Sequence, residues 1–324
     1  MSQLIIVTGA AGFIGRNVVA ELNRRGHDHL LLVDQLGSEE KWSNLVGLHY
    51  EDILSPDVFL QNVKAGNVPP VAACIHLGAC SATTEKNSDY LLENNYRYTR
   101  ALCEWSLRQG VRFVYASSAA TYGDGSLGYS DADAVTPRLR PLNMYGYSKH
   151  LFDLWALRTG HLNRIVGLKY FNVYGPYEDH KGSMRSLVQK AYHQIQKSGH
   201  IELFKSYHPD YRDGEQKRDF IYVRDAVNVT LHFALEDLKA GGLFNCGTGM
   251  ARTWIDLAQA LFAAMGAKPD IRFIEMPEIL RGKYQYFTQA DSTKLRQAGY
   301  ERPFMSLEEA VRDYVQSHLA ATAI

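Results

Sequence analysis

The sequence predicts an α/β protein with a doubly wound parallel sheet and a smaller α/β substrate-binding lobe. Three observations favour this class. Short apolar runs alternate with longer amphipathic stretches through the first half of the chain. A glycine-rich turn, GAAGFIG, directly follows the first of these runs. The 324 residues are 46% hydrophobic and 22% charged, which is typical of a folded chain with one or two sizeable cores.

The elements of the first half follow from periodicity, because apolar runs of four to eight residues indicate buried strands and helical spacing indicates helices. Ile14, Val18 and Leu22 illustrate the helical spacing. Strands are expected at 4–8, 29–34, 71–77, 111–117 and 164–171, and helices at 13–25, in a stretch ending near Gly66, at 89–109 and at 145–160.

After Gly175-Pro176 the regular alternation of strands and helices ends. Helices are expected at 183–197, 225–237 and 253–265, the last with Thr253 as N-cap, and Ser306 with Glu309 forms a capping box for the final helix. The polar stretch 207–219 reads as a loop, and strands at 220–223 and 242–247 are expected to return to the main sheet. We therefore expect a dinucleotide-binding domain from 1–172 with 220–248, and a substrate-binding domain from 173–219 with 249–324.

Composition excludes several classes of protein. Lys+Arg and Asp+Glu balance at 35 each, so neither nucleic acid nor an anionic membrane is an expected partner. The first residues lack a signal peptide pattern, and no apolar run is long enough to span a bilayer. The four cysteines and twelve histidines show no metal-ligand spacing, so no metal is expected. We expect a cytoplasmic protein with reduced thiols.

The turn GAAGFIG has the glycine spacing of a dinucleotide site. Gly9, Gly12 and Gly15 would permit the tight turn, the approach of a pyrophosphate and close helix packing. Asp34 ends the second strand, where a carboxylate would hold the ribose hydroxyls and favour NAD over NADP. Lys41, however, could fold back onto a 2′-phosphate, so the spacing alone leaves the choice of cofactor open.

Tyr145 and Lys149 in NMYGYSKH share one helix face, whereas Tyr147 points elsewhere. A cation beside a phenol favours the phenolate and makes it useful for proton transfer. Such pairs also occur by chance on helix surfaces. Ser118, at the end of an earlier strand, lies where ligands bind in open parallel sheets, and it turns the pair into a specific combination.

This combination, with RDFIYVRD (218–225) and NCGTG (245–249), resembles the extended short-chain dehydrogenase/reductase family over essentially the whole chain. The resemblance implies that Tyr145 is the acid/base, that Lys149 binds the nicotinamide ribose and lowers the tyrosine pKa, and that Ser118 orients the reacting hydroxyl. By the same resemblance, the remaining cofactor contacts are Phe13, Ile14, Gln35, Asp52, Ile53, Leu77, Gly78, Ala79, Asn94 and Val173.

Ser118-Ala119-Ala120-Thr121 lacks the Asp–Glu pair of the family's dehydratases, which favours epimerisation or simple oxidoreduction. The stretches 76–85, 169–184 and 281–291 resemble the branch that epimerises carbon 6 of an ADP-activated heptose for the lipopolysaccharide inner core. That likeness implies bound NADP rather than NAD, a homo-oligomer (a pentamer in that branch) and Lys181 as a second acid/base. It further implies a substrate site that includes Ser118, Asn172, Ser183, Lys190, Phe204, Arg218 and Tyr284.

A second proton carrier has a geometric reason. Hydride leaves one face of the carbon and returns to the other, so the sugar terminus must turn over beside a fixed cofactor, and its oxygen meets a different group. Lys181 could instead be a diphosphate-binding or surface lysine, and Arg218 could pair with Asp219 or another carboxylate rather than with phosphate. The rival functions are a UDP-hexose 4-epimerase that uses Tyr145 alone and a catalytically inactive dinucleotide-binding scaffold.

Overall fold

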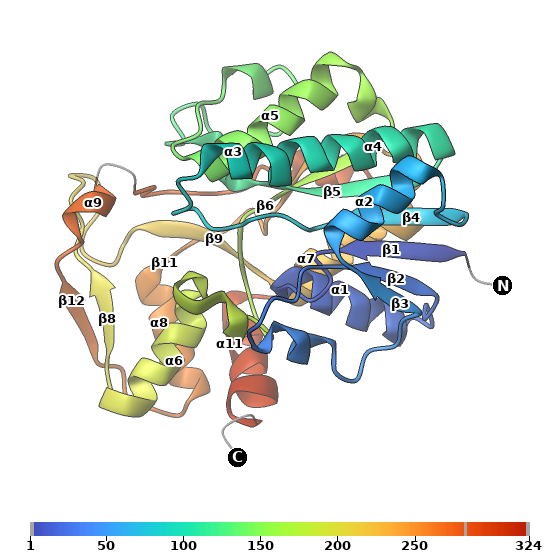
Figure 1. The fold of residues 1–324 in the computed structure, drawn as a ribbon. Coiled ribbons are helices and arrows are strands. Elements are labelled where there is room, and N and C mark those ends of the chain that lie inside the picture. The colour runs from blue at the N-terminus through green and yellow to red at the C-terminus, as the bar shows by residue number, and fades with distance from the viewer. Residues whose placement is uncertain (1–2, 282–283, 322–324) are drawn as a thin grey trace.

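A computed structural model of the chain describes residues 3–281 and 284–321. Figure 1 shows a central sheet with helices above and below it, and a second group of elements to its left. The doubly wound parallel class predicted from the sequence is confirmed.

The central sheet has seven strands in the order β10-β6-β5-β4-β1-β2-β3, and every neighbouring pair is parallel. The order runs outward in both directions from β1 and β4, so the strand ends beside β1 form the crevice in which such sheets bind ligands. The strands are β1 (Leu4–Thr8), β2 (Leu30–Val33), β3 (Asp52–Leu54), β4 (Val71–His76), β5 (Arg112–Ser118), β6 (Val166–Tyr170) and β10 (Gly242–Cys246).

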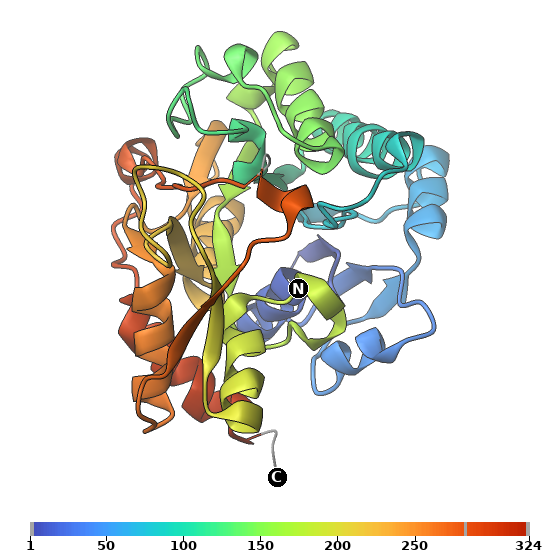
Figure 2. The same cartoon turned by 90° about the vertical axis from the view of Figure 1, so that its left-hand side faces the viewer.

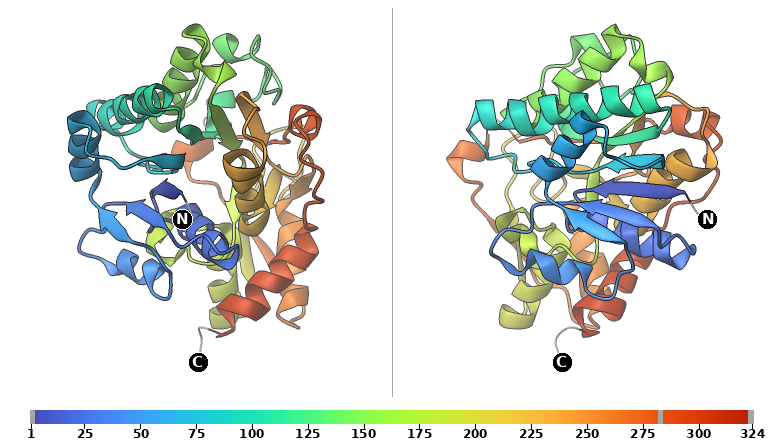
Figure 3. Two further views of the ribbon diagram at one scale, coloured as in Figure 1. Left: turned by 90° about the vertical axis from the view of Figure 1, so that its right-hand side faces the viewer. Right: turned by 45° about the vertical axis from the view of Figure 1, so that its right-hand side comes forward.

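Helices cover both faces of this sheet (Figures 1 and 3). One face carries α2 (Pro56–Ala65), α3 (Ser88–Leu91), α4 (Tyr98–Gln109) and α5 (Met144–Arg158). The other carries α1 (Phe13–Arg24) and α7 (Val223–Leu231). Each face has its own apolar core, since Phe59, Leu102 and Phe152 belong to one buried cluster and Val18 and Val227 to another.

The smaller lobe contains two further sheets (Figure 2). One has the order β11-β9-β7, and the other pairs β12 with β8. These strands are β7 (Asn172–Tyr174), β8 (Ile201–Phe204), β9 (Lys217–Tyr222), β11 (Ala251–Thr253) and β12 (Ile271–Ile274), and the helices are α6 (Leu187–Ser198), α8 (Trp254–Ala264), α9 (Glu278–Arg281), α10 (Thr293–Gln297) and α11 (Leu307–Tyr314).

The expectation that 220–223 joins the main sheet is wrong. These residues lie in β9, which pairs with β7 and β11, and only β10 of the two expected strands reaches the main sheet. The error has a simple cause: both strands are buried along almost their whole length, so they read alike in sequence. The predicted loop 207–219 is also too long, because β9 begins at Lys217 and includes Arg218 and Asp219.

The helix expected at 183–197 begins four residues later, at Leu187. Ser186 is its N-cap and accepts a hydrogen bond from the amide of Gln189. Residues 179–184 form a separate turn in which Gly182 has φ of 52°. The caps predicted at Thr253 and Ser306 are confirmed, and each forms a capping box.

The long helix expected at 89–109 is divided into α3, a wider π-helical turn at 92–97, and α4. Within the described parts of the chain, no helix is both long and apolar enough to cross a membrane.

Candidate active site

The glycine turn brings two strand ends into close contact. Gly9 has φ of 69°, and a Cβ added to it would lie 2.7 Å from the amide nitrogen of Gly78, in the turn after β4. A Cβ on Gly15 would lie 2.0 Å from the carbonyl oxygen of Gly9. Only glycine therefore fits at both positions, and the first turn of α1 is left open for an anion.

A pocket of about 520 Å³ opens at the carboxyl ends of β1, β4, β5 and β6. It is lined by most of the residues that the sequence assigned to cofactor and catalysis. These are Gly9, Gly12, Phe13, Ile14, Gly15, Asp34, Lys41, Leu77, Gly78, Ala79, Ser118, Tyr145, Lys149, Val173 and Lys181. A neighbouring hollow of about 300 Å³ shares Gly9, Asp34 and Lys41 with it and adds Gln35 and Asn94.

Asp34 lines the pocket next to the glycine turn. Its carboxylate accepts hydrogen bonds from the amides of Ala11 at 2.8 Å and Gln35 at 2.7 Å, and it pairs with Lys41 Nζ at 2.5 Å. Lys41 has thus folded back to this carboxylate. Its contact with a 2′-phosphate stays a prediction. The glycine cradle, the first-turn amides and this ion pair together fit a dinucleotide whose adenosine end lies at Asp34.

Tyr145, Lys149 and Ser118 line the same pocket beside β5, where Ser118 hydrogen-bonds Tyr145 and Lys149 reaches the Ala116 carbonyl. Asn143 caps α5 by accepting a hydrogen bond from the Gly146 amide, which fixes the first turn that carries Tyr145. Lys149 is buried, and its Nζ donates to the carbonyl of Ala116 at 2.8 Å. Tyr147, in contrast, is 44% exposed.

Burial controls the protonation of this pair. It raises the pKa of Tyr145, and a side-chain hydrogen bond with Ser118 opposes the rise. It lowers the pKa of Lys149 to about 8, which Asp153 partly counteracts. Desolvation is thus the largest effect on the phenol, and Lys149 Nζ donates to the Ala116 carbonyl. That Lys149 lowers the pKa of Tyr145 stays a prediction.

A buried polar network holds α5 against the sheet beneath the site. The carboxylate of Asp153 accepts hydrogen bonds from Tyr115 at 2.8 Å and Ser117 at 2.7 Å, and it pairs with Lys169 at 3.0 Å. Lys169 also donates to Thr121 at 2.7 Å. This network fixes the orientation of the helix that presents Tyr145 and Lys149.

Lys181 reaches the pocket from the segment 176–184, which connects β7 to α6. Its Nζ lies 4.9 Å from the ring centre of Phe13 and 3.9 Å from the carboxylate of Glu178. Burial lowers the pKa of Lys181, Glu178 raises it, and Lys190 lowers it further. The pocket thus holds a phenol and an amine, two groups able to exchange a proton with one bound molecule.

Eight predicted residues line neither hollow. Asp52 and Ile53 lie on the edge strand β3, and the Asp52 carboxylate accepts a hydrogen bond from the Ile53 amide. The others belong to the smaller lobe or to the strand and segment leading into it, and are Asn172, Ser183, Lys190, Phe204, Arg218 and Tyr284. Gly282 and Lys283, in the RGKYQYFTQAD stretch, lie outside the described residues.

Arg218 is the charged centre of an aromatic cluster. It is 6% exposed, and its guanidinium lies 4.9 Å from the ring centre of Tyr284 and 5.7 Å from that of Trp254. Burial lowers its pKa. Asp219 does not pair with it, because that carboxylate accepts bonds from the amides of Thr248, Gly249 and Ala290. Among the described residues no ion pair joins Arg218 to a carboxylate, so the salt-bridge alternative is wrong. One guanidinium nitrogen donates to the Lys217 carbonyl at 2.8 Å, and the rest of the fork could take an anion.

Sequence reasoning missed several residues that line the main pocket. Those within or next to the carboxyl ends of β5 and β6 (Ala116, Ser117, Tyr170 and Phe171) could have been found from that position alone. His180 could not, because its contact with Asn44 Nδ2 at 3.0 Å joins parts of the chain far apart in sequence. The missed residues are Cys80, Ser81, Ala82, Ala116, Ser117, Tyr170, Phe171, His180 and Met184.

No three His, Cys, Asp or Glu side chains among the described residues are placed to hold a metal ion.

Comparison with known proteins adds to this geometry. Residues 5–247 match the NAD dependent epimerase/dehydratase family. An ADP-L-glycero-D-manno-heptose-6-epimerase of Nitratidesulfovibrio vulgaris is 56% identical over 319 residues, which cover 98% of each chain. The crystal structure of the Helicobacter pylori ADP-L-glycero-D-manno-heptose-6-epimerase superposes with a TM-score of 0.82 at 26% identity, covering 99% of this chain and 97% of the other. A Thermotoga maritima UDP-glucose 4-epimerase superposes at 0.80 with 25% identity, covering 99% and 100%.

Proposed function

The chain belongs to the NAD dependent epimerase/dehydratase family, and on that premise we propose that it inverts carbon 6 of ADP-D-glycero-β-D-manno-heptose. The product would be ADP-L-glycero-β-D-manno-heptose, formed through a transient 6-keto sugar, for the heptose of the lipopolysaccharide inner core. One observation carries the proposal: a single pocket is lined by both Tyr145 and Lys181. The 56% identity to a relative of that name supports the choice of sugar.

A nicotinamide dinucleotide held by the glycine turn, Asp34 and Lys41 would supply a reversible hydride acceptor. The chain's own residues do the rest. The Ser118 hydroxyl and the Tyr145 phenol face the reacting oxygen in one orientation of the sugar terminus, and Lys181 faces it in the other. Tyr145 and Lys181 alternate: one removes the proton from the C6 hydroxyl, and the other protonates the ketone oxygen after the terminus has turned.

Lys149 and Arg218 serve binding in this proposal. Lys149 is held by the Ala116 carbonyl and would donate to the nicotinamide ribose. Arg218, with an aromatic wall and no carboxylate partner among the described residues, would hold the diphosphate through its two-pronged donor geometry.

We assign NADP rather than NAD. A 2′-phosphate beside Asp34 alone would be repelled, but Lys41 pairs with that carboxylate and offers a cation at the same place. Releasing the bound cofactor from purified protein and identifying it by mass spectrometry tests this assignment, and NAD as the main species would overturn it. A homo-oligomer, specifically a pentamer, is also part of the proposal and is tested by light scattering.

The decisive assay offers ADP-D-glycero-β-D-manno-heptose and UDP-glucose side by side in D₂O, with NMR detection. Epimerisation of the first, with the C6 proton retained, supports the proposal, because the hydride returns without exchange with solvent. Conversion of UDP-glucose alone would favour the 4-epimerase, and conversion of neither would favour a dinucleotide-binding scaffold. Deuterium at C6 would contradict the hydride mechanism.

A further inference from the structure

Glu178 is a fully buried carboxylate three residues before Lys181. One of its oxygens accepts hydrogen bonds from Ser186 Oγ at 2.5 Å and from the Tyr314 hydroxyl at 3.2 Å. The other accepts from the Ser186 amide at 2.5 Å. The carboxylate therefore joins the segment that carries Lys181 to the N-cap of α6 and to α11, and its own position is closely fixed.

The second oxygen of Glu178 also lies 3.9 Å from Lys181 Nζ. Of the groups that act on this amine, Lys190 from α6 disfavours its charge, and Phe13 from α1 presents a ring face that favours it. Asp179 and His180 lie in the same segment, directly before Lys181, and the charge of Lys181 acts on His180. Glu178 is the carboxylate that stabilises the Lys181 ammonium against the cost of its burial.

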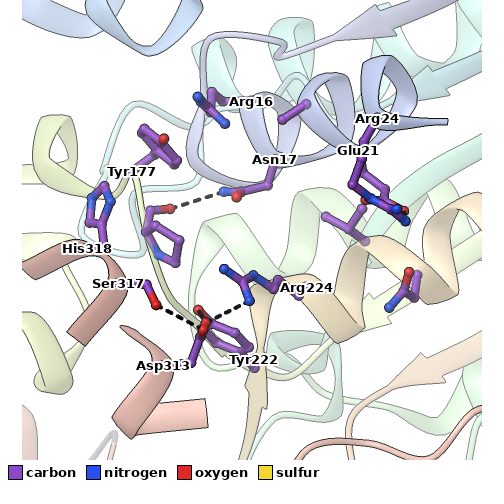
Figure 4. A pocket seen from close by; sticks show the side chains of 14 residues that line it. Arg16, Asn17, Glu21, Arg24, Tyr177, Tyr222, Arg224, Asp313, Ser317 and His318 are labelled. Atoms are coloured by element: carbon purple, nitrogen blue, oxygen red, sulfur yellow. Dashed lines mark hydrogen bonds and ion pairs between the residues drawn. The ribbon is translucent and has the colours of Figure 1, made fainter. Parts of the chain in front are cut away.

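The path of the chain into Glu178 is fixed by other contacts, which Figure 4 shows in a second pocket of about 490 Å³. Asn17 Nδ2 donates to the Pro176 carbonyl at 3.1 Å. The guanidinium of Arg16 stacks 3.5 Å from the ring centre of Tyr177, and the ring of His318 lies 4.8 Å from the same ring on another side. These contacts hold Tyr177 at φ of 72° without using the Glu178 carboxylate.

We propose that Glu178 is a positioning residue for Lys181, holding the amine at the pocket wall and stabilising the ammonium form in which it donates its proton to the ketone oxygen. The inference rests on the proposed function, since the role matters only if Lys181 exchanges a proton with the sugar. Glu178 itself lines neither the main pocket nor the neighbouring hollow. Without its charge, the amine would lose its proton more readily and could no longer donate at the same pH.

The test measures the protonation of Lys181 directly and does not require activity. Wild type, Glu178→Gln, Glu178→Asp and Tyr314→Phe are labelled with trace acetic anhydride across pH, and peptide mass spectrometry follows acetylation of Lys181. We expect Glu178→Gln to lower the apparent pKa of Lys181 by about one to three units, the range for loss of a close opposite charge. Glu178→Asp, which keeps the charge, should restore part of the shift.

Two comparisons separate a charge effect from a structural one. Tyr314→Phe removes one hydrogen bond to Glu178 but no charge, so Lys181 should titrate as in the wild type. The exposed Lys197 on α6 is an internal reference that should titrate alike in every variant. An unchanged Lys181 titration in Glu178→Gln, or an equal shift in Tyr314→Phe, would overturn the inference. If Glu178→Gln does not fold, Glu178→Asp is compared with Tyr314→Phe, because the shorter side chain moves the charge away from Lys181 Nζ. Glu178→Asp should then lower the apparent pKa of Lys181 while Tyr314→Phe leaves it unchanged, and equal titrations in the two would overturn the inference.

The second readout is the pH dependence of kcat with ADP-heptose. In Glu178→Gln the high-pH limb of the kcat profile should shift to lower pH by the same interval as the labelling curve. The reason is that Lys181 loses its donatable proton at a lower pH. A uniform loss of kcat at all pH values, with the limb unmoved, would mean that Glu178 acts only on structure. A shifted labelling curve in a protein that does not epimerise ADP-heptose would uphold the coupling and overturn the proposed function.

Discussion

Replacing Lys169 by Met should destabilise the protein severely. Both Lys169 and Asp153 are 0% exposed, and their charges lie 3.0 Å apart. Removing the lysine leaves a buried carboxylate whose remaining bonds come from neutral hydroxyls, those of Tyr115 and Ser117. Breaking a buried pair by removing one partner costs about 3–5 kcal/mol.

A loss of that size is a large share of the total stability of a folded protein, which is typically about 5–15 kcal/mol. The assay is urea unfolding followed by circular dichroism, with the wild type and Lys169→Met measured in parallel. The matched control is the double variant Asp153→Asn with Lys169→Met, which removes both charges and keeps an acceptor for the two hydroxyls. We expect the double variant to recover most of the loss.

Two results would refute the reasoning. A loss below about 1 kcal/mol in Lys169→Met would mean that the buried charge is relieved without its partner. A double variant as unstable as the single one would mean that the packing of the Lys169 stem, rather than its charge, carries the stability.

Three further predictions concern the site. Tyr145→Phe should lose about 10²- to 10⁴-fold in kcat while still binding the dinucleotide, and unchanged turnover would remove Tyr145 from the mechanism. Gly15→Ala should weaken dinucleotide binding in equilibrium dialysis at least about tenfold, because its Cβ would lie 2.0 Å from the Gly9 carbonyl oxygen; wild-type affinity would show that the turn is not the binding element. Burial lowers the pKa of Lys149 from 10.5 to about 8, so between these values the unfolded chain binds more protons at this site and stability rises with pH. Across that interval the wild type should gain on the order of 3 kcal/mol relative to Lys149→Met, and parallel urea midpoints at pH 7.5 and 10.5 would contradict it.

The predictable part of the site rests on local rules. The sequence predicts Ser118 as a site residue because ligands bind at strand ends. It predicts Tyr145 and Lys149 as a pair because residues four apart share a helix face. The glycine turn was found for the same kind of reason, since its spacing fixes a backbone path. Each of these signals lies within one element and its flanking turn.

The remainder depends on tertiary contacts. Nothing near Lys169 in the sequence indicates that Asp153 will meet it, and Glu178 reads as an ordinary acidic residue until Tyr314 and Ser186 enclose it. The prediction that residues 220–223 join the main sheet is wrong for a related reason. A buried strand has the same sequence pattern whichever sheet it joins. Ser186 is the exception: its N-cap preference was present in the sequence and could have placed the start of α6 correctly.

The central claim is that Lys181 exchanges a proton with the sugar, and Lys181→Met tests it most directly. Steady-state kinetics with ADP-D-glycero-β-D-manno-heptose should be compared with the wild type and with Lys197→Met, a surface lysine on α6. The account predicts a loss of about 10²- to 10⁴-fold in kcat for Lys181→Met and no change for Lys197→Met. A raised KM with kcat intact would make Lys181 a binding residue only and would contradict the two-carrier mechanism.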